Sequence, residues 1–105
     1  MRLALLSLLG ALSLSSVAFG MDIGERKYDA LCASCHGKDG KAQTPVGRKL
    51  KAKDLTTPGL FSKYTDAQLV KKIQEGNPAK KFPAFKNKMS EAEIEAVVAY
   101  LRTLK

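Results

Sequence analysis

The segment Cys32-Ala33-Ser34-Cys35-His36 constrains this chain more than any other part of its sequence, because it holds both cysteines and the only histidine. Two thiols three positions apart, with a histidine directly after the second, are the pattern of covalent haem attachment. Each thiol forms a thioether with one haem vinyl group, and the neutral imidazole lies beneath the porphyrin, where it can bind iron. The segment therefore predicts haem c, with Cys32 and Cys35 as the thioether residues and His36 as the proximal iron ligand.

Three other uses of the two cysteines explain less of this segment. A thioredoxin-like redox centre expects strands that alternate with helices, and the sequence has no alternating strand pattern. A structural zinc site needs four ligands, whereas the chain offers only these three sulfur or nitrogen donors. A disulfide between the cysteines would leave His36 without a role. Haem attachment uses all three residues.

The first twenty residues have the pattern of an export signal. Arg2 supplies a positive start, residues 3–17 form a Leu-rich apolar run, and small residues stand at the two positions that a signal peptidase reads. We expect residues 1–20 to be a signal peptide that is cleaved before Met21. The alternative is an uncleaved membrane anchor, for which the apolar run is short.

Residues 21–105 are expected to form one small domain. Cleavage removes Arg2, so 17 basic and 10 acidic residues leave a charge of +7. A domain of this size usually needs extra stabilisation, which a haem would supply. In bacteria this kind of haem attachment takes place outside the cytoplasmic membrane. Both signals therefore predict a periplasmic or otherwise exported protein, with no stable membrane insertion after cleavage.

The hydrophobic pattern of the mature sequence is helical, with no alternating strands. A first helix is expected to begin with Asp22 as its N-cap and to run through the attachment segment. Several Gly and Pro residues make residues 37–60 a loop-rich region. Thr65 and Gln68 form the capping box of a middle helix that ends at Gly76.

The last helix has the strongest signals. Ser90 is the expected N-cap, and Glu93 completes its capping box. Met89 and Ile94 occupy the two positions of a hydrophobic staple. The sequence thus predicts an all-α fold, with three main helices packed around one covalently bound haem. The apolar face of the last helix follows helical spacing: Ile94, Val97, Val98 and Leu101.

The chain resembles the class I cytochromes c, especially the small bacterial and photosynthetic ones. The resemblance spans nearly all of residues 22–104, and three motifs carry it: CASCHGKDG at 32–40, PAF at 83–85 and SEAEIEAVVAYLR at 90–102. It implies a monohaem cytochrome c that carries one electron at a time between redox proteins and converts no substrate of its own. A haem-based sensor or peroxidase-like protein with an open distal iron site is the alternative. A subunit docked permanently on a larger oxidase or reductase is a third possibility.

The resemblance also implies a crossing of the first and last helices. Gly24 and Tyr28 stand where the family has a small residue and an aromatic on its first helix. The last helix would contribute Val97 and Tyr100. A glycine has no side chain, so it lets the two helix backbones approach closely.

The resemblance indicates where the residues around both axial positions of the iron are expected. A backbone carbonyl at Thr44 or Pro45 would accept the second imidazole N–H of His36. In the small bacterial relatives the distal methionine stands immediately before the PAF segment, where this chain has Phe82. Phenylalanine cannot bind iron. Met89 is therefore the distal candidate in this sequence.

Three interpretations of the distal side remain open. Met89 supplies the thioether after a rearrangement of the preceding loop. Otherwise Met89 only packs on Ile94, and the iron is five-coordinate behind Phe82. In the third interpretation Lys80 or Lys81 binds as an amine, after it loses its proton. Thioether ligation raises the reduction potential, whereas an open position admits small ligands.

Lysines crowd the middle and distal segments of the sequence. Most of them individually are expected to be solvated, but together they suggest a positive field that would steer a redox partner with an acidic docking surface. Nucleic acid is a poor candidate, because the chain carries an export signal and its basic residues lack interleaved aromatics. The lysines are Lys49, Lys51, Lys53, Lys63, Lys71, Lys72, Lys80, Lys81, Lys86 and Lys88.

Overall fold

The computed structural model describes residues 12–105, so the first eleven residues of the predicted signal peptide lie outside the described part. The described chain is helical and contains no strand, only an isolated antiparallel bridge between Asn77 and Phe82. The predicted all-α fold is confirmed. In chain order the elements are α1 (Leu12–Leu31), α2 (Ala33–His36), α3 (Pro45–Leu50), α4 (Asp66–Glu75), the 3-10 helix η1 (Pro78–Lys80) and α5 (Glu91–Leu101).

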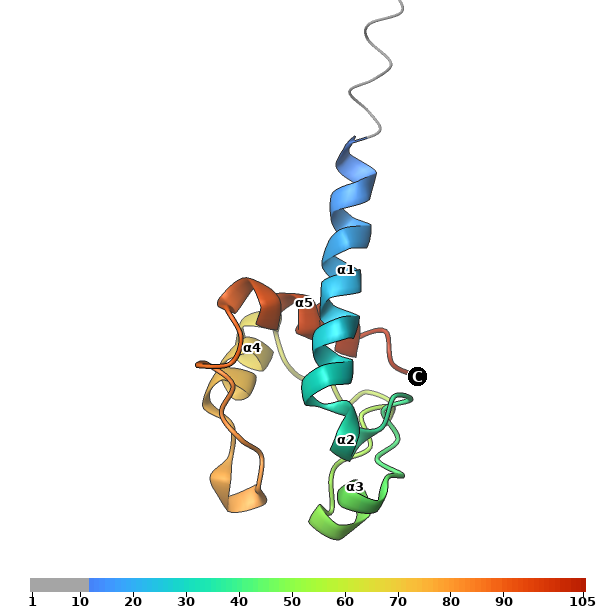
Figure 1. Cartoon of the computed structure of the whole chain (residues 1–105), viewed down its shortest axis with the longest axis vertical. Helices are drawn as coiled ribbons and strands as arrows, with labels where there is room; N and C mark the ends of the chain where they lie inside the picture. Colours follow the sequence, from blue (N-terminus) through green and yellow to red (C-terminus); the bar gives the residue numbers. More distant parts are fainter. Residues whose placement is uncertain (1–11) are drawn as a thin grey trace, which may run out of the picture.

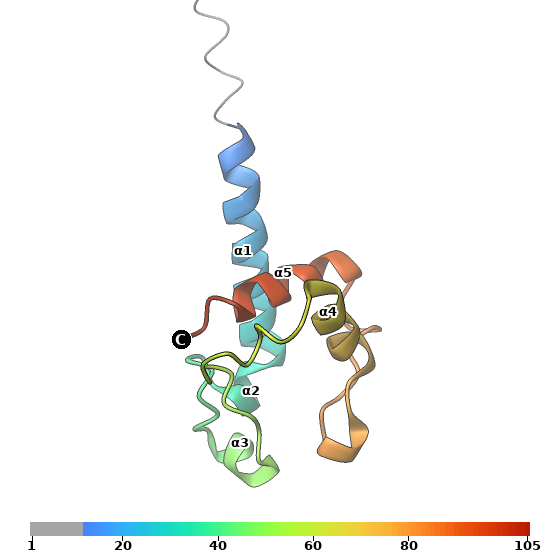
Figure 2. The same cartoon turned by 180° about the vertical axis from the view of Figure 1, so that it is seen from behind.

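Helices α1 and α5 cross at a glycine, and α4 packs against α5 beside this crossing (Figures 1 and 2). A Cβ atom at Gly24 would lie 2.2 Å from the carbonyl oxygen of Ala96, so only glycine allows the two backbones to come this close. Tyr28 is fully buried, and its ring centroid lies 5.2 Å from that of Tyr100. The predicted crossing point is confirmed, and Val97 is buried at it.

One apolar core joins these three helices to the segment that precedes α5. Its side chains repeat at helical spacing on α4 and α5, and each removes apolar surface from water, which stabilises the fold. The core consists of Tyr28, Leu69, Val70, Ile73, Phe85, Met89, Ile94, Val97, Val98 and Leu101.

Both predicted capping boxes are present, which explains where α4 and α5 begin. The backbone N–H of Gln68 donates to the hydroxyl of Thr65 over 3.1 Å, and the N–H of Thr65 donates to the Gln68 side chain over 2.9 Å. The corresponding pair at α5 joins Ser90 and Glu93 over 3.2 and 2.8 Å. Gly76 ends α4 as predicted, with a φ of 65° that favours glycine.

The first helix differs from its prediction at both ends. It begins at Leu12 and not at Asp22, so Asp22 lies inside the helix and does not cap it. Asp22 forms an ion pair with Arg26 over 3.1 Å, one turn along α1. The helix ends at Leu31, and Cys32 forms the turn before α2. Among residues 12–105, no helix combines the length and the apolar character needed to cross a membrane.

Two arms extend from the same side of this helical framework (Figures 1 and 2). We call residues 32–60, which include α2 and α3, the attachment arm. Residues 76–89, which include η1, form the return arm between α4 and α5. Arg102, the C-cap of α5, holds residues 61–65, the stretch between the attachment arm and α4, in place through hydrogen bonds. Its guanidinium donates to the carbonyls of Phe61 and Tyr64 over 3.1 and 2.9 Å, and to the Asp66 carboxylate over 2.7 Å.

Candidate functional site

The three predicted attachment residues lie on a single turn of the chain. The backbone N–H groups of Cys35 and His36 donate to the carbonyl of Cys32 over 3.3 and 3.0 Å, so the turn is closed by its own hydrogen bonds. Both thiols are free and half-buried. The structure therefore brings together two separate thiols and an imidazole on one small surface.

A backbone carbonyl fixes the orientation of the His36 ring. The Nδ1 atom lies 2.9 Å from the carbonyl oxygen of Lys53. A carbonyl oxygen only accepts, so the proton of the neutral imidazole is on Nδ1. The lone pair of Nε2 is then available to a metal ion.

The acceptor expected at Thr44 or Pro45 is wrong, and the reason is local. The carbonyl of Thr44 already accepts the N–H of Arg48 in the first turn of α3, over 2.9 Å. The Thr44 hydroxyl instead donates to the carbonyl of Cys35 over 3.0 Å and caps α3. The chain returns to His36 only after α3, where the backbone carbonyl of Lys53 accepts the imidazole N–H.

Helix α3 packs directly on the attachment turn. A Cβ atom at Gly47 would lie 2.1 Å from the carbonyl oxygen of Cys35, so glycine is needed at this contact. On the other side of the turn, the Tyr28 hydroxyl donates to the carbonyl of Gly37 over 2.6 Å. Burial raises the pKa of this phenol well above its ordinary value, which keeps the donor protonated. The turn is thus held between α1 and α3.

The Cys32 thiol is protonated in the unmodified chain. Burial is the larger cause and the nearby Cys35 the smaller, and together they raise the pKa of this thiol to about 11. Within residues 12–105, no group of three or more His, Cys, Asp or Glu side chains is placed to hold a metal ion.

The apolar surroundings fit a haem. Several large apolar side chains pack against the core with one side and remain half-exposed on the other, as a flat apolar group needs. Both arms and the stretch that joins them to α4 contribute to this set. Its members beside the attachment turn, in the arms and in the stretch before α4 are Leu31, Cys32, Ala33, Leu55, Phe61, Tyr64 and Phe82.

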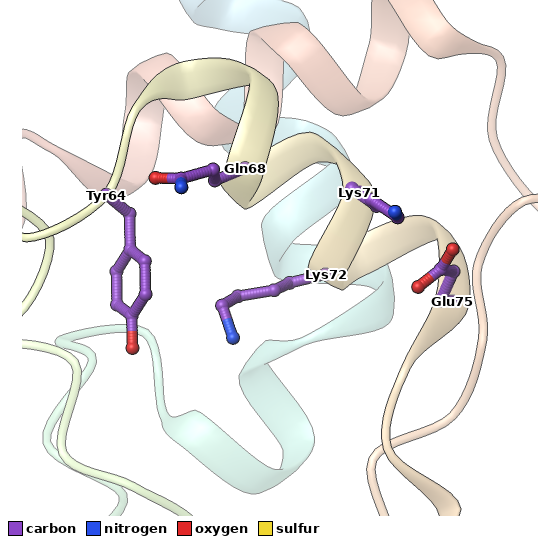
Figure 3. A pocket seen from close by; sticks show the side chains of 5 residues that line it. All are labelled: Tyr64, Gln68, Lys71, Lys72 and Glu75. Atoms are coloured by element: carbon purple, nitrogen blue, oxygen red, sulfur yellow. The ribbon is translucent and has the colours of Figure 1, made fainter.

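Lysines contribute to the lining of two hollows in the described part of the chain. One, of about 450 Å³, lies between the end of α3 and η1 and is lined by Lys49, Leu50, Lys51, Ala79, Lys80 and Lys81. The other, of about 380 Å³, lies against α4 (Figure 3). Its lining includes Tyr64, which precedes α4, and Lys72, which belongs to α4. The ammonium of Lys72 lies 4.8 Å from the centroid of the Tyr64 ring.

The candidates for the distal ligand lie in different surroundings. Met89 is a core residue with 5% of its surface exposed. Lys80 and Lys81 are exposed. Phe82 is half-buried, and its ring centroid lies 5.9 Å from that of Phe85.

Sequence reasoning missed two contributors to this site. Lys53 acts through its backbone carbonyl, which carries no signal in the residue type. Gly47 belongs to a helix that was expected to be loop. The Thr44-Pro45 pair could have revealed that helix, since threonine is a good N-cap and proline is favoured at the first helical position.

Comparisons with known proteins agree on the kind of protein that this chain resembles. A family model described as cytochrome c oxidase, cbb3-type, subunit III, matches residues 20–101. A cytochrome c6 of Synechococcus sp. is 38% identical over 90 residues, which cover 84% of this chain and 75% of that protein. A solved structure of KustC0563, a c-type cytochrome, superposes with a TM-score of 0.69 at 32% identity and covers 78% of this chain and 96% of its own.

A larger protein also matches. The cbb3-type cytochrome c oxidase subunit CcoP of Azospirillum brasilense is 30% identical over 90 residues, which cover 86% of this chain. The chain spans only 30% of the length of that subunit. The similarity therefore concerns one part of CcoP.

Proposed function

Because this chain belongs to the family of c-type cytochromes, we propose that Cys32, Cys35 and His36 hold its haem while it passes single electrons between larger redox proteins. The protein is a monohaem electron carrier, and its cofactor is haem c. The observation that carries the residue assignment is the orientation of His36. Its Nδ1–H donates to the backbone carbonyl of Lys53, and its Nε2 is free to bind iron on the same turn as both thiols.

Each residue of the turn has a separate task. Thioethers from Cys32 and Cys35 would keep the cofactor on the chain, so it would not be lost when partners change. His36 would bind the iron, and the Lys53 carbonyl holds the ring and increases its basicity. When bound, the haem supplies an iron that changes between the ferric and ferrous states by one electron.

The framework holds this arrangement from two sides. Gly47 places α3 against the turn, and Tyr28 holds its other side through the carbonyl of Gly37. A proximal side that does not move adds little reorganisation to electron transfer. We propose that the chain converts no substrate of its own.

Covalent haem attachment is tested by the mass of the processed protein after expression with a haem-attachment system. The proposal expects the mass of one haem per chain, retained after acid–acetone extraction. The double variant Cys32→Ala, Cys35→Ala should lose its haem on extraction, whereas Ser34→Ala, on the same turn, should retain it. A processed wild-type chain without added haem mass contradicts the proposal.

The export signal and the mature start belong to the same proposal. We propose that residues 1–20 direct the chain out of the cytoplasm and are removed before Met21. Sequencing of the N-terminus of protein from the periplasmic fraction tests both points. A mature chain that begins at residue 1 in the membrane fraction would support the anchor alternative.

The lysine-lined hollow between α3 and η1 supports an acidic docking surface on the partner. Four of its six lining residues are lysines, and no carboxylate lines it. Such a field speeds association, and the association rate should fall about tenfold or more between low and physiological salt. Electron transfer to a small acidic redox protein should slow in Lys80→Glu, Lys81→Glu but keep its rate in Lys80→Arg, Lys81→Arg. Equal rates in both double variants would contradict this docking site.

A further inference from the structure

The distal side of the iron can be assigned from the packing of the residues that have suitable donor atoms. Protein atoms surround Met89 on nearly every side, since only 5% of its surface is exposed. By contrast Cys32, Cys35 and His36 keep part of their surface free for a non-protein group. Met89 therefore packs among other core side chains and leaves little of its surface for a further group.

The backbone holds Met89 in this position from both sides. Its N–H donates to the carbonyl of Phe85 over 3.0 Å. The next residue, Ser90, caps α5 through two hydrogen bonds with Glu93. Moving Met89 toward a haem would break the cap and leave a cavity beside Ile94, which is 1% exposed.

The return arm holds Phe82 just as firmly. Its N–H donates to the carbonyl of Asn77 over 3.0 Å, and its carbonyl accepts the N–H of Asn77 over 2.8 Å. A Cβ atom at Gly76 would lie 2.5 Å from the carbonyl carbon of Pro83, so the start of the arm is in close contact with the residue that follows Phe82. Phe82 shares the half-buried apolar set with Cys32 and cannot bind iron.

The remaining donors are poorly suited. Met21 precedes Cys32 by eleven residues, or about 16 Å along a helix. Lys72 is placed over the Tyr64 ring, and a positive charge favours that contact. An amine must lose its proton before it binds iron, which also applies to Lys80 and Lys81.

We infer that Met89 is a packing residue and that the chain presents no imidazole or thioether to the distal face of the iron. That face, beside Phe82, is a binding site for a small neutral diatomic ligand such as carbon monoxide. An apolar wall suits a neutral ligand better than an ion. The inference rests on the proposed function, because it requires haem bound through His36. A ligand that prefers ferrous iron would keep the carrier reduced and slow its delivery of electrons.

The test uses the haem-loaded protein at neutral pH, with the spin state of its ferric form and carbon monoxide binding to its ferrous form as readouts. We expect a high-spin ferric spectrum and tight binding of carbon monoxide. Met89→Leu, which nearly conserves volume, should leave both unchanged. Phe82→Met should make the iron low-spin and weaken carbon monoxide binding at least tenfold, whereas the matched Phe82→Leu should remain high-spin.

Several results would overturn the inference. A low-spin wild-type spectrum that becomes high-spin in Met89→Leu identifies the thioether as the ligand. The same change in Lys72→Ala, Lys80→Ala or Lys81→Ala identifies an amine. If the Phe82→Met variant stays high-spin, residue 82 does not lie at the distal face. A chain without covalent haem refutes the proposed function instead, and its mass separates that failure from the others.

Discussion

The crossing of α1 and α5 buries its apolar side chains almost completely, whereas the two arms leave most of their apolar side chains half-buried. Tyr28 and Val97 at the crossing are 0% and 1% exposed. In the arms, Leu55 and Phe82 cover the core with only one side. The framework is packed by protein alone, while the arms present apolar surface to a further group. We infer from this contrast that the helices hold the arms in position and that the haem covers the apolar surface that the arms leave exposed.

The most damaging substitution should be one at the helix crossing. Gly24→Val places a side chain where a Cβ alone would lie 2.2 Å from the Ala96 carbonyl oxygen. We expect the free energy of unfolding of the haem-loaded protein to fall by about 3 kcal/mol. Thermal unfolding followed by far-UV circular dichroism measures the loss. Ala30→Val introduces the same valine side chain at an exposed position of α1 and should cost about 0.5 kcal/mol. Equal losses of unfolding free energy in the two variants would contradict the tight packing of the helix crossing.

A substitution in the attachment arm should affect the haem more than the core. Gly47→Ala forces α3 away from the Cys35 carbonyl, which a Cβ would approach to 2.1 Å. We expect a loss of about 1–2 kcal/mol in unfolding free energy, together with a shifted reduction potential. Potentiometric titration measures the second effect. Val46→Ala, on the exposed side of the same helix, should change neither quantity. An unshifted potential in Gly47→Ala would show that α3 does not support the site.

The caps of the framework should contribute smaller, independent amounts. Ser90→Ala removes the hydroxyl that accepts the Glu93 N–H, and Thr65→Ala does the same at α4. Each should lower the unfolding free energy by about 1 kcal/mol. Because the caps belong to different helices, the double variant should lose the sum of both effects. Denaturant titration checks this, and a much larger combined loss would show that the caps are coupled.

The smallest effect should be a change in pH dependence. The backbone N–H of Ser90 and the ammonium of Lys27 hold the pKa of the Glu93 carboxyl below its ordinary value. Its folded pKa is lower than its unfolded pKa, so its contribution is complete above the unfolded pKa and is lost as pH falls through the folded pKa. Glu93→Gln should therefore lose less stability on acidification than the wild type. Lys27→Met removes only the ion pair and should lie between them. Identical acid profiles would contradict this assignment.

The sequence was most informative where structure depends on neighbours along the chain. The capping boxes at Thr65 and Ser90 satisfy backbone groups within three residues, so their residue types predict them directly. The crossing at Gly24 was predicted from the family resemblance, and the close contact there explains why that position holds a glycine. The His36 acceptor is a backbone carbonyl 17 residues away, and no side chain marks it. Helix α3 was missed because Pro45 and Gly47 usually break helices, although here they begin one and pack it.

The pairing of α1 with α5 also sets an order of events during folding. Glu91, the first residue of α5, is made 56 residues after Cys35. Until then α1 has no partner for its apolar stripe, and a contact this distant in sequence closes slowly. The two thiols meanwhile remain accessible on an incomplete chain. Both thiols also stay partly exposed once the helix pair has formed, so the framework can be complete before the cofactor is joined to it.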